Sequence, residues 1–368
     1  MNVAPVTLFD HASTQLGELC RVAGFPEDDG DPVDVLRELL GAAGRRPLTE
    51  PPLWPSDVAD DATPVEFSVA FDESGDRAVR ILAETIPEKP GPAANIVAAK
   101  RFLTHMAQRL DLSLDRFRAV EDLFLTERPR GKFALWFSVI LRPGRAPALK
   151  VYFNPQVRGR REAPGLVAEG LRRLGLRDAY DTVTRHATLR READQFSFFA
   201  LDLDDGPLSR VKLYISHDSA ESATVERAAQ AVEGADPLAV REFLATAGGG
   251  AGPYAGRPLV SSYSFVEAYA GGPGNYSLYL PIRDYVPDDA VARRHVLAHF
   301  RQAGLPAEDL DRAIGAVTSR PADDGVGLIA HVSLRLGRFG SGTTVYLSSE
   351  AYAVNPPRRR VSAATAML

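Results

Sequence analysis

The sequence has little that would support a disulfide scaffold, a membrane anchor or a nucleic-acid site. Cys20 is the single cysteine among 368 residues, so an intrachain disulfide is impossible and a cysteine-based zinc site is not expected. The formal net charge of -5 gives no overall basic field that would attract nucleic acid or an anionic membrane. The longest apolar run, residues 133–141, is far shorter than the roughly 20 residues of a membrane-spanning helix. These absences predict a cytoplasmic protein whose partners are small molecules.

Lysine is also scarce. Of 43 basic residues only five are lysines, namely Lys89, Lys100, Lys132, Lys150 and Lys212. The composition is otherwise that of an ordinary globular protein, with 45% hydrophobic and 25% charged residues. Because arginine is the usual cation of this chain, the position of each lysine is informative.

A short alternating pattern with a tyrosine in its middle occurs four times. The tyrosines are separated by 62, 65 and 67 residues. The four segments are 149–153, 211–215, 277–280 and 344–347, and 79–82 is a weaker fifth copy. Recurrence at a nearly constant spacing indicates an internally repeated fold.

Each copy follows another strand-like stretch, and a turn rich in polar residues, glycine or proline separates the two. The preceding stretches are 66–71, 133–141, 196–203, 259–269 and 328–336. Such pairs are typical of β-hairpins. Between hairpins the apolar period changes from two to about 3.6, which predicts helices. These helices are expected within 96–124, 164–190, 222–246 and 288–318, with others around 6–40.

Ten antiparallel strands can hide their edges and bury their apolar faces by closing into a barrel. The expected fold class is therefore α+β, a ten-stranded antiparallel β-barrel surrounded by a ring of α-helices. We expect a helical segment at 1–60 packed on the barrel. One barrel domain of five helix–helix–strand–strand repeats is expected at 61–355, with a C-terminal tail at 356–368.

The alternate residues of the repeated strands then point into the lumen. They are Lys150, Tyr152, Arg210, Lys212, Tyr214, Ser277, Tyr279 and Tyr346. Buried lysine and arginine require an anion, and a diphosphate supplies several acceptor oxygens. A tyrosine ring face stabilises a nearby carbocation by roughly 0.5–2 kcal/mol. These groups suit a reaction that expels pyrophosphate and leaves an allylic cation, which is prenyl transfer.

The chain lacks the Asp-Asp-x-x-Asp motif through which isoprenyl synthases and terpene cyclases hold diphosphate on magnesium. Its Asp pairs, at 28–29, 60–61, 204–205, 288–289 and 323–324, each miss the third Asp. We therefore expect the protein to supply the positive charge, with no essential Mg2+ and no other cofactor. His295 and His299 lie four apart on a predicted helix without a third ligand, so we interpret them as a helix-surface pair and predict no metal site.

Four motifs together resemble those of the dimethylallyltryptophan synthase family, the aromatic prenyltransferases with the ABBA or PT-barrel fold. They are Pro64-Val-Glu66-Phe-Ser68, Lys150-Val-Tyr152-Phe-Asn-Pro155, Arg210-Val-Lys212-Leu-Tyr214, and Tyr279-Leu-Pro281 followed by Asp288-Asp289. The resemblance covers about residues 60–350 and is closest to the bacterial branch. It implies transfer of a dimethylallyl group from dimethylallyl diphosphate to an indole in secondary metabolism, with L-tryptophan as the leading acceptor.

The resemblance also implies a role for each matching residue. Glu66 would accept the indole N–H and aim the ring at the cation. The diphosphate would be bound by Arg80, Lys150, Arg210, Lys212, Tyr279 and Tyr346. The cation would be shielded by Tyr152, Tyr214, Tyr279 and Tyr346.

Three departures from the family pattern concern the acceptor and the diphosphate site. Residues 133–139 lack the lysine that removes the ring proton in members that attack carbon four of indole, so the indole nitrogen or another ring carbon is equally open, with Glu66 as a candidate base. Ser197 stands where those members have the arginine that binds the tryptophan carboxylate. Ser277 replaces a glutamine. The attack position, regular or reverse prenylation and the prenyl chain length stay open.

Several further side chains are assigned to the lumen on weaker grounds, from their place on the predicted strands. They are Trp136, Ser138, Ser277, His331 and Arg335. Arg80 has an alternative, which is an ion pair with Glu84 on the surface.

Two alternative functions remain at this point. The enzyme could prenylate another aromatic compound, such as tyrosine, an indole-containing peptide or a hydroxynaphthalene. A barrel that binds a phosphorylated or aromatic ligand without turning it over is the alternative from another class. Either would be a monomer or a homodimer.

Overall fold

The computed structural model describes residues 4–26, 31–72, 75, 77–269 and 272–358. Most of the expected tail, residues 359–368, therefore lies outside the described residues. Within the described ranges, every helix is too short or too polar to span a bilayer.

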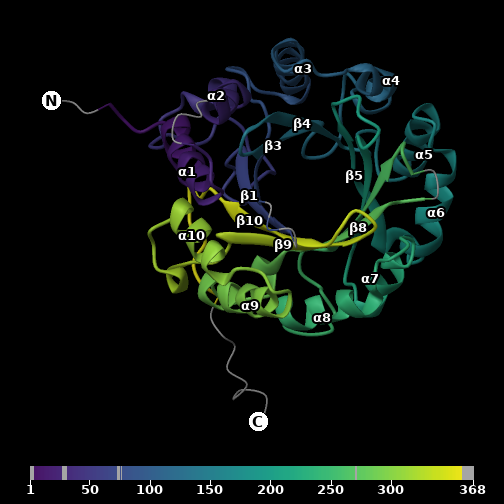
Figure 1. Ribbon diagram of the computed structural model, residues 1–368. Coiled ribbons are helices and arrows are strands. Elements are labelled where there is room, and N and C mark those ends of the chain that lie inside the picture. Colours follow the sequence, from purple (N-terminus) through teal and green to yellow (C-terminus); the bar gives the residue numbers. More distant parts are fainter. Residues whose placement is uncertain (1–3, 27–30, 73–74, 76, 270–271, 359–368) are drawn as a thin grey trace, which may run out of the picture.

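The described residues form one closed antiparallel barrel of ten strands (Figure 1). Neighbours in the barrel are neighbours in the chain, and β1 closes the ring by pairing with β10. The strands are β1 (Val65–Asp72), β2 (Arg77–Ala83), β3 (Leu135–Arg142), β4 (Arg145–Phe153), β5 (Asp194–Asp202), β6 (Arg210–His217), β7 (Leu259–Val266), β8 (Asn275–Leu280), β9 (Ile329–Gly337) and β10 (Gly342–Ser348). Each strand overlaps its predicted stretch, so the five predicted hairpins and the barrel are confirmed.

Two α-helices precede each hairpin, and together they surround the barrel (Figure 1). Over the described part of the chain they are α1 (Leu8–Val22), α2 (Asp31–Gly44), α3 (Pro92–Arg109), α4 (Asp115–Phe124), α5 (Ala163–Arg173), α6 (Arg177–Ala187), α7 (Ser222–Ala229), α8 (Pro237–Ala247), α9 (Asp289–Gln302) and α10 (Ala307–Val317). The N-terminal helices α1 and α2 supply the helix pair of the first repeat. The described residues thus form five repeats of two helices followed by two strands, arranged around one closed barrel.

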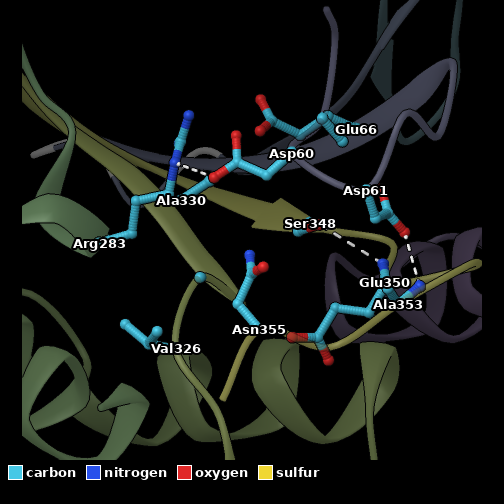
Figure 2. Close-up of a pocket in the computed structure, with 12 residues that line it drawn as sticks. Asp60, Asp61, Glu66, Arg283, Val326, Ala330, Ser348, Glu350, Ala353 and Asn355 are labelled. Carbon is cyan, nitrogen blue, oxygen red and sulfur yellow. Dashed lines mark hydrogen bonds and ion pairs between the residues drawn. The ribbon is translucent and has the colours of Figure 1, made fainter. Parts of the chain in front are cut away.

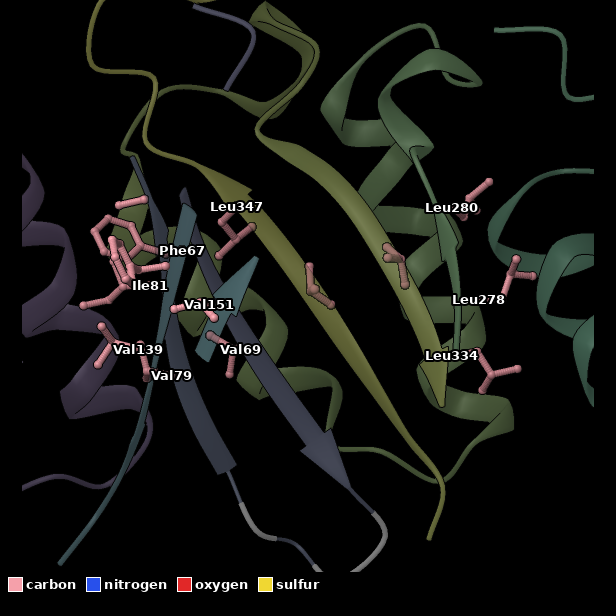
Figure 3. Packing of buried hydrophobic residues seen from close by; sticks show 14 of the residues in the cluster. Phe67, Val69, Val79, Ile81, Val139, Val151, Leu278, Leu280, Leu334 and Leu347 are labelled. Carbon is pink, nitrogen blue, oxygen red and sulfur yellow. The ribbon is translucent and has the colours of Figure 1, made fainter. Parts of the chain in front are cut away.

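The outward faces of the strands form the hydrophobic core together with the helices. Figure 3 shows part of this layer, in which Phe67 and Val69 of β1 are both buried. Phe124 of α4 stacks on Phe153 of β4 and on Phe199 of β5, with ring centroids 5.2 and 5.0 Å apart. Burying one such side chain contributes about 1.5–3 kcal/mol. This apolar layer leaves the inner strand face free to be polar.

A buried set of hydrogen bonds joins the first of the five repeats to the last. Gln15 of α1 donates through Nε2 to the carbonyls of Val317 and Ser349, each at 2.9 Å. The Ser349 hydroxyl in turn donates to Oε1 of Gln15 at 2.7 Å. Because the amide is fully used by partners from the last repeat, it fixes α1 against α10 and completes the helix ring.

The Asp pair at 288–289 has a structural role. Asp288 is the N-cap of α9 and accepts from the Val291 amide at 2.7 Å. Asp289 is 1% exposed and accepts from the Gly327 and Leu328 amides at 3.0 and 3.2 Å, and Arg320 donates to it as well. This carboxylate therefore positions the segment that leads into β9.

His299 on α9 corrects the expectation of a helix-surface pair. It is buried, and its Nε2 lies 2.8 Å from the Thr343 hydroxyl of β10. Burial lowers the pKa of His299 to about 4, so the ring is neutral near pH 7. His295 instead contacts the Ala247 carbonyl through Nδ1 at 3.2 Å.

We predict that Asp289→Ala lowers the free energy of unfolding by about 3 kcal/mol, because it leaves buried amides and part of Arg320 without an acceptor. The matched variant Asp288→Ala removes an N-cap and should cost about 1 kcal/mol. Urea denaturation followed by circular dichroism measures both. Equal losses for the two variants would contradict the role given to Asp289.

Candidate active site

The inner faces of the strands enclose a cavity of about 630 Å3. Most of the residues predicted to face the lumen line it. They are Arg80, Ser138, Lys150, Tyr152, Arg210, Lys212, Tyr214, Ser277, Tyr279, Arg335 and Tyr346. Arg80 donates to the Thr344 hydroxyl at 3.3 Å inside this cavity, whereas Glu84 is buried and accepts from Ser56 and Asn95. The alternative surface ion pair between Arg80 and Glu84 is therefore not formed.

Two buried lysines dominate the electrostatics of the cavity. Lys150 and Lys212 are each 6% exposed. Burial, with Arg210 nearby, lowers the pKa of Lys150 to about 7. Burial, with Lys150 and Arg210 nearby, holds the pKa of Lys212 well below its usual value. The lowered pKa values show that holding both lysines charged in the free protein is unfavourable, and a bound anion would favour their charged forms.

Asp202 at the end of β5 is a counter-charge that we did not identify from the sequence. It lies opposite Lys150 in the strand register, with Oδ1 3.3 Å from Lys150 Nζ, and Arg210 Nε donates to Oδ2 at 2.6 Å. Burial alone would raise the pKa of Asp202, but Lys150 and Arg210 lower it below the usual range. One carboxylate is therefore shared by two cations, and Lys212 has no ion-pair partner among the described residues.

Four tyrosines form a continuous arc along the same wall. The ring centroids of Tyr152 and Tyr214 are 5.7 Å apart, as are those of Tyr214 and Tyr279, and Tyr279 and Tyr346 are 5.9 Å apart. Lys212 Nζ lies 5.1 Å from the Tyr214 ring centroid. Burial raises the pKa of Tyr152, Tyr214 and Tyr346, so these phenols stay neutral. The arc presents ring faces next to the cations, as the repeated Lys-x-Tyr pattern predicted.

An aromatic cluster contacts this arc through Phe198, whose ring lies 6.1 Å from that of Tyr152 and 5.6 Å from that of Tyr214. Trp136 is on the inner face opposite Tyr152, but it does not line the large cavity. Its ring stacks on Phe133 at 4.0 Å and lies 5.7 Å from Phe198. Ser197 precedes Phe198 at an irregularity in the β5 register, and its buried hydroxyl has no hydrogen-bond partner among the described residues. This wall supplies no charge.

Glu66 lies on the inner face of β1 but outside the large cavity. It lines a much smaller cavity of about 10 Å3 together with Asp60 and Arg283 (Figure 2). Burial raises the pKa of Glu66 to about 7, although nearby Arg283 acts in the opposite direction. His331, another predicted lumen residue, is also outside the large cavity, and Arg283 Nη1 lies 3.1 Å from its Nδ1.

Arg283 was missed in the sequence because it has no place in the alternating pattern. It lies on the short 3-10 helix η2 (Ile282–Asp284), directly after the Tyr279-Leu-Pro281 motif. The described residues contain no group of three or more His, Cys, Asp or Glu side chains that could hold a metal ion.

Comparison with known proteins identifies the family. The family model for tryptophan dimethylallyltransferase matches residues 33–245. The chain belongs to the tryptophan dimethylallyltransferase family. A 6-dimethylallyltryptophan synthase from Micromonospora olivasterospora, solved in complex with DMASPP and Trp, is 50% identical, with a TM-score of 0.91 over 95% of this chain and 99% of that one.

Two further solved members have the same architecture. The prenyltransferase PriB, in a binary complex with product diphosphate, is 40% identical, with a TM-score of 0.90 over 96% of this chain and 99% of that one. A 5-dimethylallyltryptophan synthase from Streptomyces coelicolor is 37% identical, with a TM-score of 0.88 over 95% and 99%. These likenesses confirm the predicted family and its barrel fold, while the roles of individual residues stay predictions.

For a tryptophan dimethylallyltransferase the arrangement predicts that Lys212 binds diphosphate. Lys212→Ala should weaken binding of inorganic pyrophosphate about 10- to 100-fold, the worth of one charge-assisted hydrogen bond of roughly 1.5–3 kcal/mol. Turnover should fall severely while the protein stays folded. Calorimetric titration with pyrophosphate measures the affinity, and the exposed Lys100→Ala is the control. Unchanged affinity in Lys212→Ala would remove this residue from the diphosphate site.

Proposed function

We propose that this protein transfers a dimethylallyl group from dimethylallyl diphosphate to the indole ring of L-tryptophan and releases pyrophosphate. The observation that carries the proposal is the pairing of buried cations with a tyrosine arc inside one cavity of the closed barrel. A diphosphate requires the cations, and an allylic cation requires the ring faces. Membership of the tryptophan dimethylallyltransferase family supports the same substrates.

The first step is cleavage of the bond between the allylic carbon and the diphosphate oxygen, and the electron pair of that bond leaves with the diphosphate. The negative charge that develops on the diphosphate would lie in the cavity lined by four cationic residues, which are Arg80, Lys150, Arg210 and Lys212. The arc from Tyr152 to Tyr346 covers the carbon cation with ring faces and excludes water. The indole ring then forms the new carbon–carbon bond, and transfer of the ring proton to the released pyrophosphate restores aromaticity.

Glu66 is the residue that we propose to bind the indole N–H. Its carboxylate would accept that hydrogen bond, which raises the electron density of the ring and orients it toward the cation. Glu66 is 4% exposed, so solvent does not compete strongly for the carboxylate. Only the ionised carboxylate would bind the indole N–H in this way. Because the pKa of Glu66 is raised to about 7, that form predominates only above about pH 7.

We further propose attachment at carbon six of the indole. The relative solved as a 6-dimethylallyltryptophan synthase is 50% identical to this chain, whereas the one solved as a 5-dimethylallyltryptophan synthase is 37% identical. The absence of a lysine on β3 agrees with attack at a position other than carbon four.

We propose that the reaction proceeds without Mg2+, in the cytoplasm. The cavity wall provides at least four cations of its own, and the Asp pair at 288–289 is occupied with structural contacts. The single cysteine, Cys20, is buried, which suits a reducing compartment.

The proposed reaction is tested by incubating the protein with L-tryptophan and dimethylallyl diphosphate in excess EDTA. Mass spectrometry should show one added dimethylallyl group, and NMR of the product should place it on carbon six.

Attachment at carbon five or nitrogen would overturn only the proposed position of attachment. Pyrophosphate release without an indole product would indicate another acceptor, and ligand-induced stabilisation without pyrophosphate release would indicate a binding barrel. An absolute need for Mg2+ would overturn the metal-free reaction.

The two pKa values near 7 predict a bell-shaped pH dependence of kcat/KM for dimethylallyl diphosphate. Activity should rise through about pH 7 as Glu66 ionises and fall above about pH 7 as Lys150 loses its proton. Initial rates between pH 5 and 9 measure both limbs. Glu66→Gln should lose the rising limb, and Lys150→Arg should move the falling limb to higher pH. A profile that is the same in both variants and the parent would contradict these assignments.

A further inference from the structure

Asp202 is a buried carboxylate in the wall of the large cavity. It is 6% exposed and lies at the end of β5. Arg210 donates to it through its backbone amide at 3.1 Å and through Nε and Nη2 of its guanidinium at 2.6 and 3.3 Å. The Nζ of Lys150 lies 3.3 Å from Oδ1. A negative charge at this place repels a diphosphate, so any benefit to the site must come through its two partners.

The two lysines of the cavity occupy equivalent places in the repeat but have different cross-strand neighbours. Lys150 on β4 is opposite Asp202 in the β4–β5 register, whereas Lys212 on β6 is opposite Ser264 in the β6–β7 register. Each lysine is 6% exposed. Burial favours the neutral form of a lysine, and a nearby anion offsets that effect. The offset is therefore given mainly to one lysine of the pair.

The remaining charged neighbours of Lys150 act against its charge. The titratable and charged groups around it are Asp202 of β5, Arg210 and Lys212 of β6, Arg80 of β2 and the ring of Tyr152, whose centroid is 5.9 Å away. Burial lowers the pKa of Lys150 most, Arg210 and Arg80 lower it further, and Asp202 raises it, which leaves the pKa at about 7. Without Asp202, Lys150 would lose its proton at a lower pH.

Resting on the proposed function, we propose that Asp202 is a positioning residue of the diphosphate site, which keeps Lys150 charged and holds the Arg210 guanidinium in place before the substrate binds. The three hydrogen bonds from Arg210 restrict its side chain, so less conformational entropy is lost when it contacts the diphosphate. A charged Lys150 contacts the diphosphate without first taking up a proton, and proton uptake would weaken binding increasingly as the pH rises.

The test compares the pyrophosphate affinity of Asp202→Asn with that of the parent protein, by calorimetric titration between about pH 5.5 and 8. Asparagine has nearly the same shape without the charge. The ratio of the variant Kd to the parent Kd should rise about 10-fold across this range, as expected if the pKa of Lys150 falls by one unit. The ionisation of pyrophosphate is common to both proteins, and the lost repulsion changes the ratio equally at every pH. A ratio that is constant with pH would overturn the proposal.

Two controls assign the effect to the pair of Asp202 and Lys150. Asp205→Asn removes the same charge from the turn that follows β5, where Asp205 is exposed and has no ion-pair partner among the described residues. It should leave the Kd within about twofold of the parent value at every pH. Arginine stays charged throughout this range, so in a Lys150→Arg background Asp202→Asn should lose most of the rise with pH. An undiminished rise in that background would contradict the role given to Asp202.

Asp202→Glu tests whether the charge itself is responsible. It keeps a carboxylate on a longer side chain, so its Kd ratio should change with pH much less than that of Asp202→Asn. The same rise in both variants would contradict the proposal. Thermal unfolding of each variant confirms that it is folded, and Asp202→Ser supplies the comparison if Asp202→Asn is not.

Pyrophosphate binding also separates this proposal from the proposed function. If the parent protein binds pyrophosphate but transfers no dimethylallyl group, the proposed function fails, and the Kd ratio still decides the role of Asp202. A parent protein that binds no pyrophosphate overturns both.

Discussion

The burial of cations without matching anions is the constraint on which the rest of this structure depends. Lys150 and Lys212 are removed from water, and among the described residues Asp202 is the carboxylate that pairs with Lys150. Such an arrangement is unfavourable in isolation, since an unpaired buried charge costs several kcal/mol. The stability must come from elsewhere, and the apolar layer between strands and helices supplies it through contacts such as Phe124 with Phe153. The closed barrel separates these two environments.

The barrel also separates two groups of charged residues into different cavities. Cations and tyrosine ring faces share the large cavity, whereas Glu66 and Arg283 share a small cavity next to it. Glu66 lines the small cavity and Lys150 and Lys212 line the large one, so the carboxylate of Glu66 is held apart from the lysines.

The sequence predicts the features of this fold that repeat and misses those that occur once. Alternation with period two located all ten strands, and recurrence of Lys-x-Tyr identified Lys150 and Lys212 as inward. Asp202 was not predicted because it lies opposite Lys150 through the pairing of β4 with β5. The spacing of residues in the sequence does not reveal the register of that pairing. Arg283 lies on a 3-10 turn outside any periodic pattern. His299 looked exposed because helical periodicity does not reveal that β10 packs against its face.

The cations and the tyrosines contribute differently to the rate. The substrate diphosphate and the released pyrophosphate would both reduce the repulsion among Lys150, Lys212 and Arg210. Most of this gain therefore strengthens binding of either anion and does not lower the activation barrier. The part that accelerates the reaction is the added negative charge on the leaving oxygen as its bond to carbon breaks. The tyrosine faces, in contrast, gain their attraction only once the carbon is positive. In the proposed reaction the arc is therefore the element whose contribution is confined to the transition state, and its four rings follow one another at centroid distances of 5.7, 5.7 and 5.9 Å.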